Sequence, residues 1–217
     1  IVSNCDLHID TYKPADMPMA YGANNHGSIV QIKDQWYIFY HRHTNGSWYS
    51  RQGCAEPISI AEDGSIEQVE ITSCGLNGGP LAGQGEYPAY LACHLFTDEP
   101  SMYVGGDAFP KVMQDGKDGD EEIGYVGNVQ NSATIGFKYF DMKNVKKIRV
   151  TMRGYISGNI EVRLTWDGDV LASLPIEFTN VWETYESEIE IPDGIHSLYF
   201  TFRGDGNGAL KSFELLV

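Results

Sequence analysis

The chain has 217 residues, which is enough for one large domain or two small ones. Its 30 acidic and 15 basic side chains give a formal net charge of −15, and such a surface repels phosphate backbones, so no nucleic-acid partner is expected. No run approaches the roughly 20 apolar residues of a membrane span, so no membrane partner is expected either. With 24 glycines and 12% aromatic residues, the composition is typical of an all-β protein, of a sugar-binding protein, or of both.

Short strand patterns separated by turn residues fill the region from 27 to 72. The run Gln35–His41 is dense in aromatic and β-branched residues, as a buried strand should be, and Asn45-Gly46 after it is a strong hairpin signal. Four strands are predicted here: 28–32, 35–41, 55–61 and 65–72. Consecutive antiparallel strands of this kind form a meander, which is the unit blade of a β-propeller.

The four cysteines, Cys5, Cys54, Cys74 and Cys93, all lie in the first half of the chain. Their even number permits disulfides, but their spacing matches neither a metal knuckle nor a redox CxxC motif. We expect buried free thiols that pack as small apolar residues. The redox compartment is left open.

The second half alternates apolar and polar residues with a period of two. Apolar residues share one face in three stretches: Ile148, Val150 and Met152; Ile160, Val162 and Leu164; Leu198, Phe200 and Phe202. This pattern, with turn residues between the stretches, predicts the half-buried strands of a β-sandwich. The polar stretch Thr97–Pro100 is the expected boundary, which divides the chain into domains 1–96 and 97–217.

Two segments of the first half carry a family resemblance. They read YGANNHGSIVQIKDQWYIFYHRHTNGSWYSRQGCAEPI over residues 21–58 and EYPAYLACHLF over 86–96. They resemble the last blade and closing segment of glycoside hydrolase family 43, in members similar to β-xylosidases and α-L-arabinofuranosidases. The resemblance implies that residues 1–96 are part of a five-bladed β-propeller. The missing N-terminal blades would then be a partner of this chain, for instance as a separate fragment.

Four further pieces of sequence carry a second resemblance. They are GYVGNVQNSATIGFKYFDM at residues 124–142, GNIEVRLTWDG at 158–168, Trp182, and GIHSLYFTFRG at 194–204. Together they resemble a family 6 carbohydrate-binding module, which often follows a family 43 propeller directly. The resemblance implies a jelly-roll-like β-sandwich over residues 97–217. The fold class expected for the whole chain is therefore all-β, a partial propeller followed by a sandwich.

The first resemblance assigns roles to residues of the blade. It places His26 at the propeller axis, where it would ligate a metal, commonly Ca²⁺, or the waters of that metal; the alternative is a histidine that only orders its loop. It places Arg51 at a sugar-binding subsite, where a planar guanidinium binds two hydroxyls; the alternative is a surface salt bridge. His43 and Trp48 are candidates for the loop that lines the cleft, or else are packing residues. His41 is expected to be structural.

The second resemblance singles out Trp182, which stands where these modules carry one ring of a pair that sandwiches a sugar. Thr134 stands at the place of the partner ring and Lys211 near the place of the usual cleft asparagine, so a packing role is favoured. Tyr125 and Tyr139 are possible substitutes for the missing ring. An acidic stretch also suggests calcium, but a solvated loop is favoured because the rest of an EF-hand is missing: Asp115, Asp118, Asp120, Glu121 and Glu122.

The expected function is that of the C-terminal portion of a glycoside hydrolase acting on xylan- or arabinoxylan-type linkages. The ligand would be a xylose- or arabinose-containing oligosaccharide or polysaccharide. The family hydrolyses with inversion, using an acid Glu, a base Asp and a second Asp that tunes the pKa of the acid. These residues come from earlier blades and no segment here matches them, so no catalytic residue is assigned to this chain.

Two alternatives are a non-catalytic glycan-binding protein and a purely structural sandwich. The sequence does not separate a xylosidase from an arabinofuranosidase. The substrate class favours a secreted or periplasmic bacterial protein.

Overall fold

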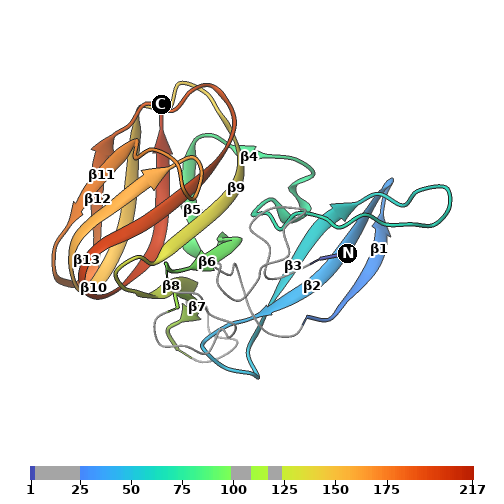
Figure 1. The fold of residues 1–217 in the computed structure, drawn as a ribbon, viewed down its shortest axis with the longest axis horizontal. Coiled ribbons are helices and arrows are strands. Elements are labelled where there is room, and N and C mark those ends of the chain that lie inside the picture. Colours follow the sequence, from blue (N-terminus) through green and yellow to red (C-terminus); the bar gives the residue numbers. More distant parts are fainter. Residues whose placement is uncertain (3–24, 99–108, 117–123) are drawn as a thin grey trace.

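The structure is a computed structural model that describes residues 1–2, 25–98, 109–116 and 124–217. These residues form two β units, a small sheet on the right of Figure 1 and a larger sandwich on the left. Their regular elements are strands and two 3₁₀ turns, Gly75–Asn77 and Ala89–Leu91, so the prediction of an all-β protein is confirmed. In this part of the chain, no helix is long and apolar enough to cross a membrane.

The small sheet, which we call the blade, is an antiparallel meander of β1 (Gly27–Ile32), β2 (Gln35–His43) and β3 (Arg51–Ile58). The aromatic run predicted to be a buried strand is β2, where Tyr37 and Tyr40 are buried. By contrast, β1 is exposed along its whole length. The structure therefore shows a three-stranded sheet, which is a coarser finding than the five-bladed propeller that the sequence predicted.

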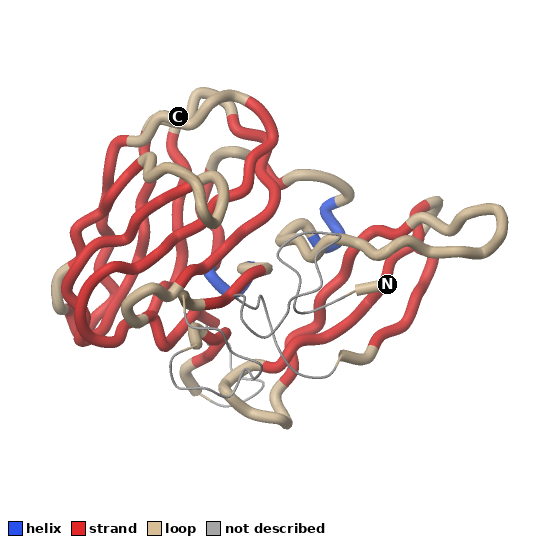
Figure 2. The backbone as a smooth tube through the Cα atoms, in the orientation of Figure 1, coloured by secondary structure: helices blue, strands red, loops and turns tan. Residues whose placement is uncertain are grey.

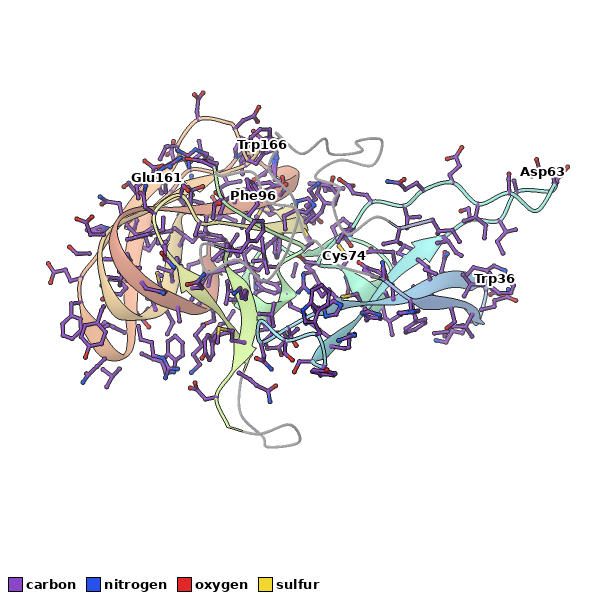
Figure 3. All side chains as sticks on the ribbon, turned by 60° about the horizontal axis from the view of Figure 1, so that its bottom comes forward. Trp36, Asp63, Cys74, Phe96, Glu161 and Trp166 are labelled. Atoms are coloured by element: carbon purple, nitrogen blue, oxygen red, sulfur yellow. The ribbon has the colours of Figure 1, made fainter. Side chains whose placement is uncertain are left out.

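The prediction of a fourth strand over 65–72 is wrong. This segment follows a long loop with Asp63 at its tip (Figure 3) and forms no strand. Backbone groups in and next to this segment bond elsewhere. The Val69 N–H donates to the Ile1 carbonyl, and the Ser73 N–H donates to the Lys138 carbonyl. A segment becomes a strand only where it can pair with the edge of another strand, and the described residues offer no such edge here.

The second unit, which we call the sandwich, is a ten-stranded sheet folded into two layers (Figure 2). Its strands are β4 (Leu81–Ala82), β5 (Gly85–Pro88), β6 (His94–Phe96), β7 (Lys111–Gln114), β8 (Gly124–Val129), β9 (Thr134–Met142), β10 (Lys147–Arg163), β11 (Ala172–Ile176), β12 (Thr179–Glu188) and β13 (Gly194–Leu216).

Two long strands organise the sandwich. β10 and β13 pair along their length, from Lys147 opposite Leu216 to Arg163 opposite Tyr199. The other edge of β10 pairs with β12 and then with β11, whereas β13 pairs with β5, β8 and β9, so both strands change neighbours along their length. Midway, Gly206 has a φ of +94°, and a Cβ there would lie 1.9 Å from the Tyr155 carbonyl oxygen. Only glycine fits this close approach.

The alternation predicted for the second half is confirmed. The expected inward residues of β10 and β13 are fully buried: Ile148, Val150, Met152, Ile160, Val162, Leu198, Phe200 and Phe202. They pack with a cluster of aromatic rings in which Phe213 lies 4.7 Å from Phe137 and 5.1 Å from Phe200 between ring centroids. The sandwich therefore has a continuous apolar core.

The segment before the expected boundary at 96/97 hydrogen-bonds with the sandwich. β5 and β6 are antiparallel to β13 and β9, with Tyr87 opposite Phe213 and Leu95 opposite Ile135. β4 pairs in parallel with β9. Figure 1 shows these short strands against the sandwich rather than against the blade. Residues 81–96 thus share a sheet with the second unit.

The described cysteines are free thiols. Cys93 is fully buried, and burial raises its pKa to about 12, so it stays protonated. Cys54 and Cys74 are half-buried, and Cys74 lies where the chain passes between the two units (Figure 3). Cys5 lies outside the described residues.

Candidate functional site

One end of the blade gathers most of the residues singled out from the sequence. β2 ends and β3 begins there, so His41, His43 and Arg51 come together across a hairpin with His43 opposite Arg51. Near its start, the connecting loop of residues 44–50 contains Asn45 and Gly46, whose φ values are 56° and 59°. These left-handed residues are what the hairpin signal predicted. We call this end the loop end of the blade.

Imidazole rings form a row at the loop end. The Nδ1 atom of His26 lies 3.1 Å from Nε2 of His41, and the two rings stack with centroids 5.4 Å apart. His43 continues the row, 5.8 Å from His41 and 5.2 Å from the ring of Trp48. Partial burial lowers the pKa of His41, and the nearby charges of Arg51, His26 and His43 lower it further. His41 is therefore held neutral near pH 7, and its Nε2 accepts a hydrogen bond from the His26 backbone N–H at 3.2 Å.

The loop also carries exposed aromatic rings. Trp48 is 59% exposed and Tyr49 is 94% exposed. The exposed Arg51 turns back to this loop, where its Nη1 donates to the carbonyls of Trp48 and Ser50. Tyr49 was not singled out from the sequence, although two consecutive aromatics in a Gly- and Ser-containing loop were a visible signal. Guanidinium donors, imidazole rings and exposed aromatic rings suit a neutral polyhydroxylated ligand, and these residues contain no carboxylate for acid–base work.

Trp182 lies apart from this group, on β12 of the sandwich. The guanidinium of Arg153 covers its ring at 4.2 Å from the centroid, and Tyr125 meets it edge-on at 5.6 Å. Asp115 fixes both neighbours, since its carboxylate accepts from Arg153 Nη2 at 2.8 Å and from the Tyr125 hydroxyl at 3.1 Å. Lys211 adds its ammonium 5.9 Å from the Trp182 ring. A cation therefore covers one face of the Trp182 ring.

The other residues considered for this part of the sandwich lie elsewhere. Thr134 is buried and bonds to Thr201, while the Tyr139 hydroxyl donates to Glu70 between the two units. Of the two possible substitutes for the missing ring, only Tyr125 therefore lies beside Trp182. The rest of the acidic stretch, 118–122, lies outside the described residues.

Most of the second unit matches a known protein family. Residues 112–215 match the family of the carbohydrate binding module (family 6). A family 6 module from Clostridium cellulolyticum, solved in complex with xylose, superposes with a TM-score of 0.50 at 17% identity, covering 63% of this chain and 99% of that one. The second unit thus resembles the family 6 carbohydrate-binding modules in sequence over residues 112–215 and in fold.

Other relatives match the chain across both the blade and the sandwich. A "Xylosidase/arabinosidase" of Thermoclostridium stercorarium is 60% identical over 99% of this chain and 47% of its own length. A crystal structure of a glycoside hydrolase family 43 arabinoxylan arabinofuranohydrolase from Bacillus subtilis superposes with a TM-score of 0.58 at 21% identity, covering 89% of this chain and 41% of that one. Both resemblances stated from the sequence are confirmed. The chain spans less than half the length of the curated relatives it matches.

A metal at the loop end is implied by the first resemblance. Calcium takes six to eight oxygen ligands, whereas His26 and His41 offer ring nitrogens that are already bonded to each other. Within the described ranges, no group of three or more His, Cys, Asp or Glu side chains is placed to hold a metal ion. The residues present do not fit calcium on their own, so a calcium site remains a prediction.

Partly buried polar side chains join the blade to the sandwich. Glu70, which follows the long loop, accepts hydrogen bonds from Lys138 Nζ at 2.6 Å and from the Tyr139 hydroxyl at 2.8 Å. Both donors lie on β9 of the sandwich. Between the two units lies a cavity of about 360 Å³ with largely apolar walls. Its lining comes from both sides and includes Tyr40, Arg42, Cys54, Leu91 and Cys93. The sandwich thus packs against the blade and is hydrogen-bonded to it.

Glu56 is the most deeply buried carboxylate near this junction, with 2% of its surface exposed. It accepts hydrogen bonds from the Tyr40 hydroxyl at 3.1 Å and from the Thr72 N–H and hydroxyl at 2.7 Å. Burial nevertheless dominates and raises the pKa of Glu56 from 4.5 to about 7. The folded chain therefore holds a proton here that the unfolded chain releases.

This raised pKa predicts a loss of stability between pH 4.5 and 7. The protonated Glu56 stabilises the fold fully below pH 4.5, its pKa in the unfolded chain, and this stabilisation is lost as the pH rises through about 7, its pKa in the folded chain. The free energy of unfolding falls by about 3 kcal/mol over this range. Glu56→Gln keeps the shape of the protonated acid, so its free energy of unfolding, measured in urea from pH 5 to 8, should change less with pH than that of the wild type. Glu183→Gln, at an exposed position, is the control. Parallel pH profiles for wild type and Glu56→Gln would contradict the assignment.

Proposed function

We propose that the chain is the C-terminal portion of a glycoside hydrolase acting on xylan- or arabinoxylan-type linkages. The observation that carries the proposal is the 60% identity, along 99% of the chain, to a protein described as a xylosidase/arabinosidase. The ligand would be a xylose- or arabinose-containing oligosaccharide or polysaccharide. Such a substrate is extracellular in most settings, which favours a secreted or periplasmic protein.

The proposal includes a five-bladed propeller to which the blade contributes strands. In the described part of the chain, β1 pairs with β2 alone, so its other edge is open. Its apolar side chains Ile29, Val30 and Ile32 are each about 40% exposed. A neighbouring blade supplied by the N-terminal part of the enzyme would cover them. His26 would then lie toward the propeller axis, with Ca²⁺ or ordered water beside it.

Catalysis is divided in this proposal. The earlier blades would supply the acid and the base of an inverting hydrolysis, in which an acid protonates the leaving oxygen while a carboxylate activates water. The loop end would form one wall of the cleft, with Arg51, His43 and Trp48 as sugar contacts. Trp182 is a further candidate contact, although Arg153 covers its ring.

A second candidate function is structural. The partly buried bonds of Glu70 to β9 and the covered ring of Trp182 favour a sandwich whose main task is to support the propeller. Binding of the chain to xylan in an affinity gel, compared between wild type and Trp182→Ala, separates this candidate from a glycan-binding module. Retention that depends on Trp182 would argue for binding.

The division of catalysis predicts that the 217-residue chain alone is inactive. Without an acid–base pair, it should show no turnover of aryl β-xylosides or aryl α-arabinofuranosides above the buffer rate. The assay is repeated after addition of the N-terminal part of the enzyme, which should restore turnover. Activity that stays with the chain through every purification step would contradict the proposal.

Arg51→Ala, made in the longer enzyme, should lower kcat/KM about ten- to a hundredfold, because a sugar hydroxyl loses a charge-assisted hydrogen bond. Arg51→Lys should rescue little of this loss, since an ammonium lacks the planar fork. Kinetics on an arabinoxylan oligosaccharide test both variants, with far-UV circular dichroism to check the fold. A folded Arg51→Ala enzyme with wild-type kcat/KM would remove Arg51 from the site.

A further inference from the structure

We propose that Asn45 is a positioning residue through which the sandwich holds loop 44–50 of the blade in place for substrate. The proposal rests on the proposed function, which puts this loop in the substrate cleft. The Asn45 N–H donates to the Val112 carbonyl at 2.8 Å, and its side-chain Oδ1 accepts from the Gln114 N–H at 3.2 Å. Two bonds of opposite direction therefore tie one loop residue to two positions on β7.

The strand that holds Asn45 is itself fixed in the core of the sandwich. β7 pairs with β8 in antiparallel register, with Val112 opposite Val126. Val112 is 6% exposed and Val126 is fully buried, and both belong to the main hydrophobic cluster. A shift of the Asn45 anchor would therefore require a shift of packed core residues, which interiors resist.

Loop 44–50 is bonded internally, so its residues are fixed together. The Thr44 N–H donates to the Ser50 carbonyl at 3.2 Å, and the Ser47 N–H donates to the Thr44 carbonyl at 3.0 Å. The ring Nδ1 of His43 lies 3.2 Å from the Ser47 carbonyl, and Arg51 donates to the Trp48 carbonyl. Anchoring Asn45 to β7 thus restricts the same loop that carries the exposed aromatic rings and the candidate sugar-binding guanidinium.

The residue type at position 45 matches both demands of the anchor. A φ of 56° is unfavourable for most residues but is tolerated by Asn, Asp and Gly. Asn and Asp also provide the side-chain oxygen that the Gln114 N–H needs. Asn45→Gly therefore keeps the backbone shape and the bond to Val112 but removes the acceptor, whereas Asn45→Asp keeps both.

The chain provides a matched control at another left-handed asparagine. Asn144 has a φ of 50°, is exposed, and bonds through its backbone N–H to the Asp193 carboxylate in the sandwich. Asn144→Gly makes the same chemical change as Asn45→Gly but away from loop 44–50. Any effect that both variants share is a general effect of glycine and not a loss of the anchor.

The test uses the longer enzyme in four forms: wild type, Asn45→Gly, Asn45→Asp and Asn144→Gly. Amide hydrogen exchange of peptides covering 43–51 reports the order of the loop, and kinetics on an arabinoxylan oligosaccharide report its effect on substrate. In Asn45→Gly we expect faster exchange confined to the loop and β7, and a fall of about three- to tenfold in kcat/KM, carried mainly by KM. Asn45→Asp should restore both readouts, and Asn144→Gly should change neither.

Two results would overturn the positioning role. One is wild-type exchange of the loop in Asn45→Gly, and the other is faster exchange with unchanged kcat/KM. A wild-type enzyme that hydrolyses no xyloside or arabinoside would instead overturn the proposed function, and this role with it.

Discussion

Arg42→Ala is expected to lower the free energy of unfolding of the chain by about 3–5 kcal/mol, because it leaves buried backbone carbonyls without donors and removes a packed side chain. Arg42 is only 5% exposed and lies on β2 of the blade. Its Nη2 donates to the Tyr90 carbonyl at 2.8 Å, its Nη1 to the Ala92 carbonyl, and its Nε to Gln52 at 2.8 Å. The guanidinium thus joins the blade to the 3₁₀ turn that leads into β6.

Urea unfolding followed by tryptophan fluorescence measures this effect in two backgrounds, one that keeps only Trp36 of the blade and one that keeps only Trp166 of the sandwich among the four tryptophans (Figure 3). In Arg42→Ala the Trp36 transition should move to lower urea and separate from that of the sandwich. Arg149→Ala is the matched control, because its ion pairs with Glu186 and Glu214 lie at the surface, where such pairs contribute little to stability. Equal effects of the two substitutions would show that the buried guanidinium has no special role.

The parts of the fold that the sequence predicted correctly are those with a local signal. Alternation of apolar residues identified β10 and β13, since a period of two fixes which side chains face the core. The dense aromatic run identified β2, and Asn45-Gly46 identified the hairpin that follows it. These signals depend only on residues close together in the chain.

The parts that were missed depend on residues far apart. Segment 65–72 was predicted as a strand because it follows a turn signal, but whether it becomes a strand is decided by a pairing edge, which no local pattern reveals. The partners of β5 and β6 lie on β13 and β9, far along the chain, so no pattern near residues 85–96 indicated that these residues pair with the sandwich. The Arg153 contact with Trp182 is equally non-local and could not be anticipated from motif positions.

The candidate site shows the same division. Sequence resemblance selected His26, His43, Trp48 and Arg51, and the structure gathers all four at the loop end of the blade. Their roles in substrate or metal binding stay predictions. The tie of Asn45 to β7 could not be read from the sequence, because it depends on how the sandwich packs against the blade.

The position of the cut decides whether the sandwich folds alone, and we expect a fragment 80–217 to be more stable than 97–217 by about 5–10 kcal/mol. The shorter fragment lacks β5 and β6 together with their core residues. Leu95 and Ala92 are fully buried, and Phe96 is 2% exposed. Tyr87 lies 5.1 Å from Phe140 and 5.6 Å from Phe213 between ring centroids.

Removing these side chains from the core exposes the rings and aliphatic groups that they cover. Each large side chain withdrawn from full burial costs about 1.5–3 kcal/mol, and the total stability of a domain is only about 5–15 kcal/mol, so fragment 97–217 should be largely unfolded. It would also expose the edges of β9 and β13 that β5 and β6 cover, which favours aggregation. Urea unfolding and light scattering of both fragments test this expectation. A cooperative, monomeric transition of 97–217 at the same urea midpoint as that of 80–217 would contradict this expectation and support the predicted domain boundary at 96/97.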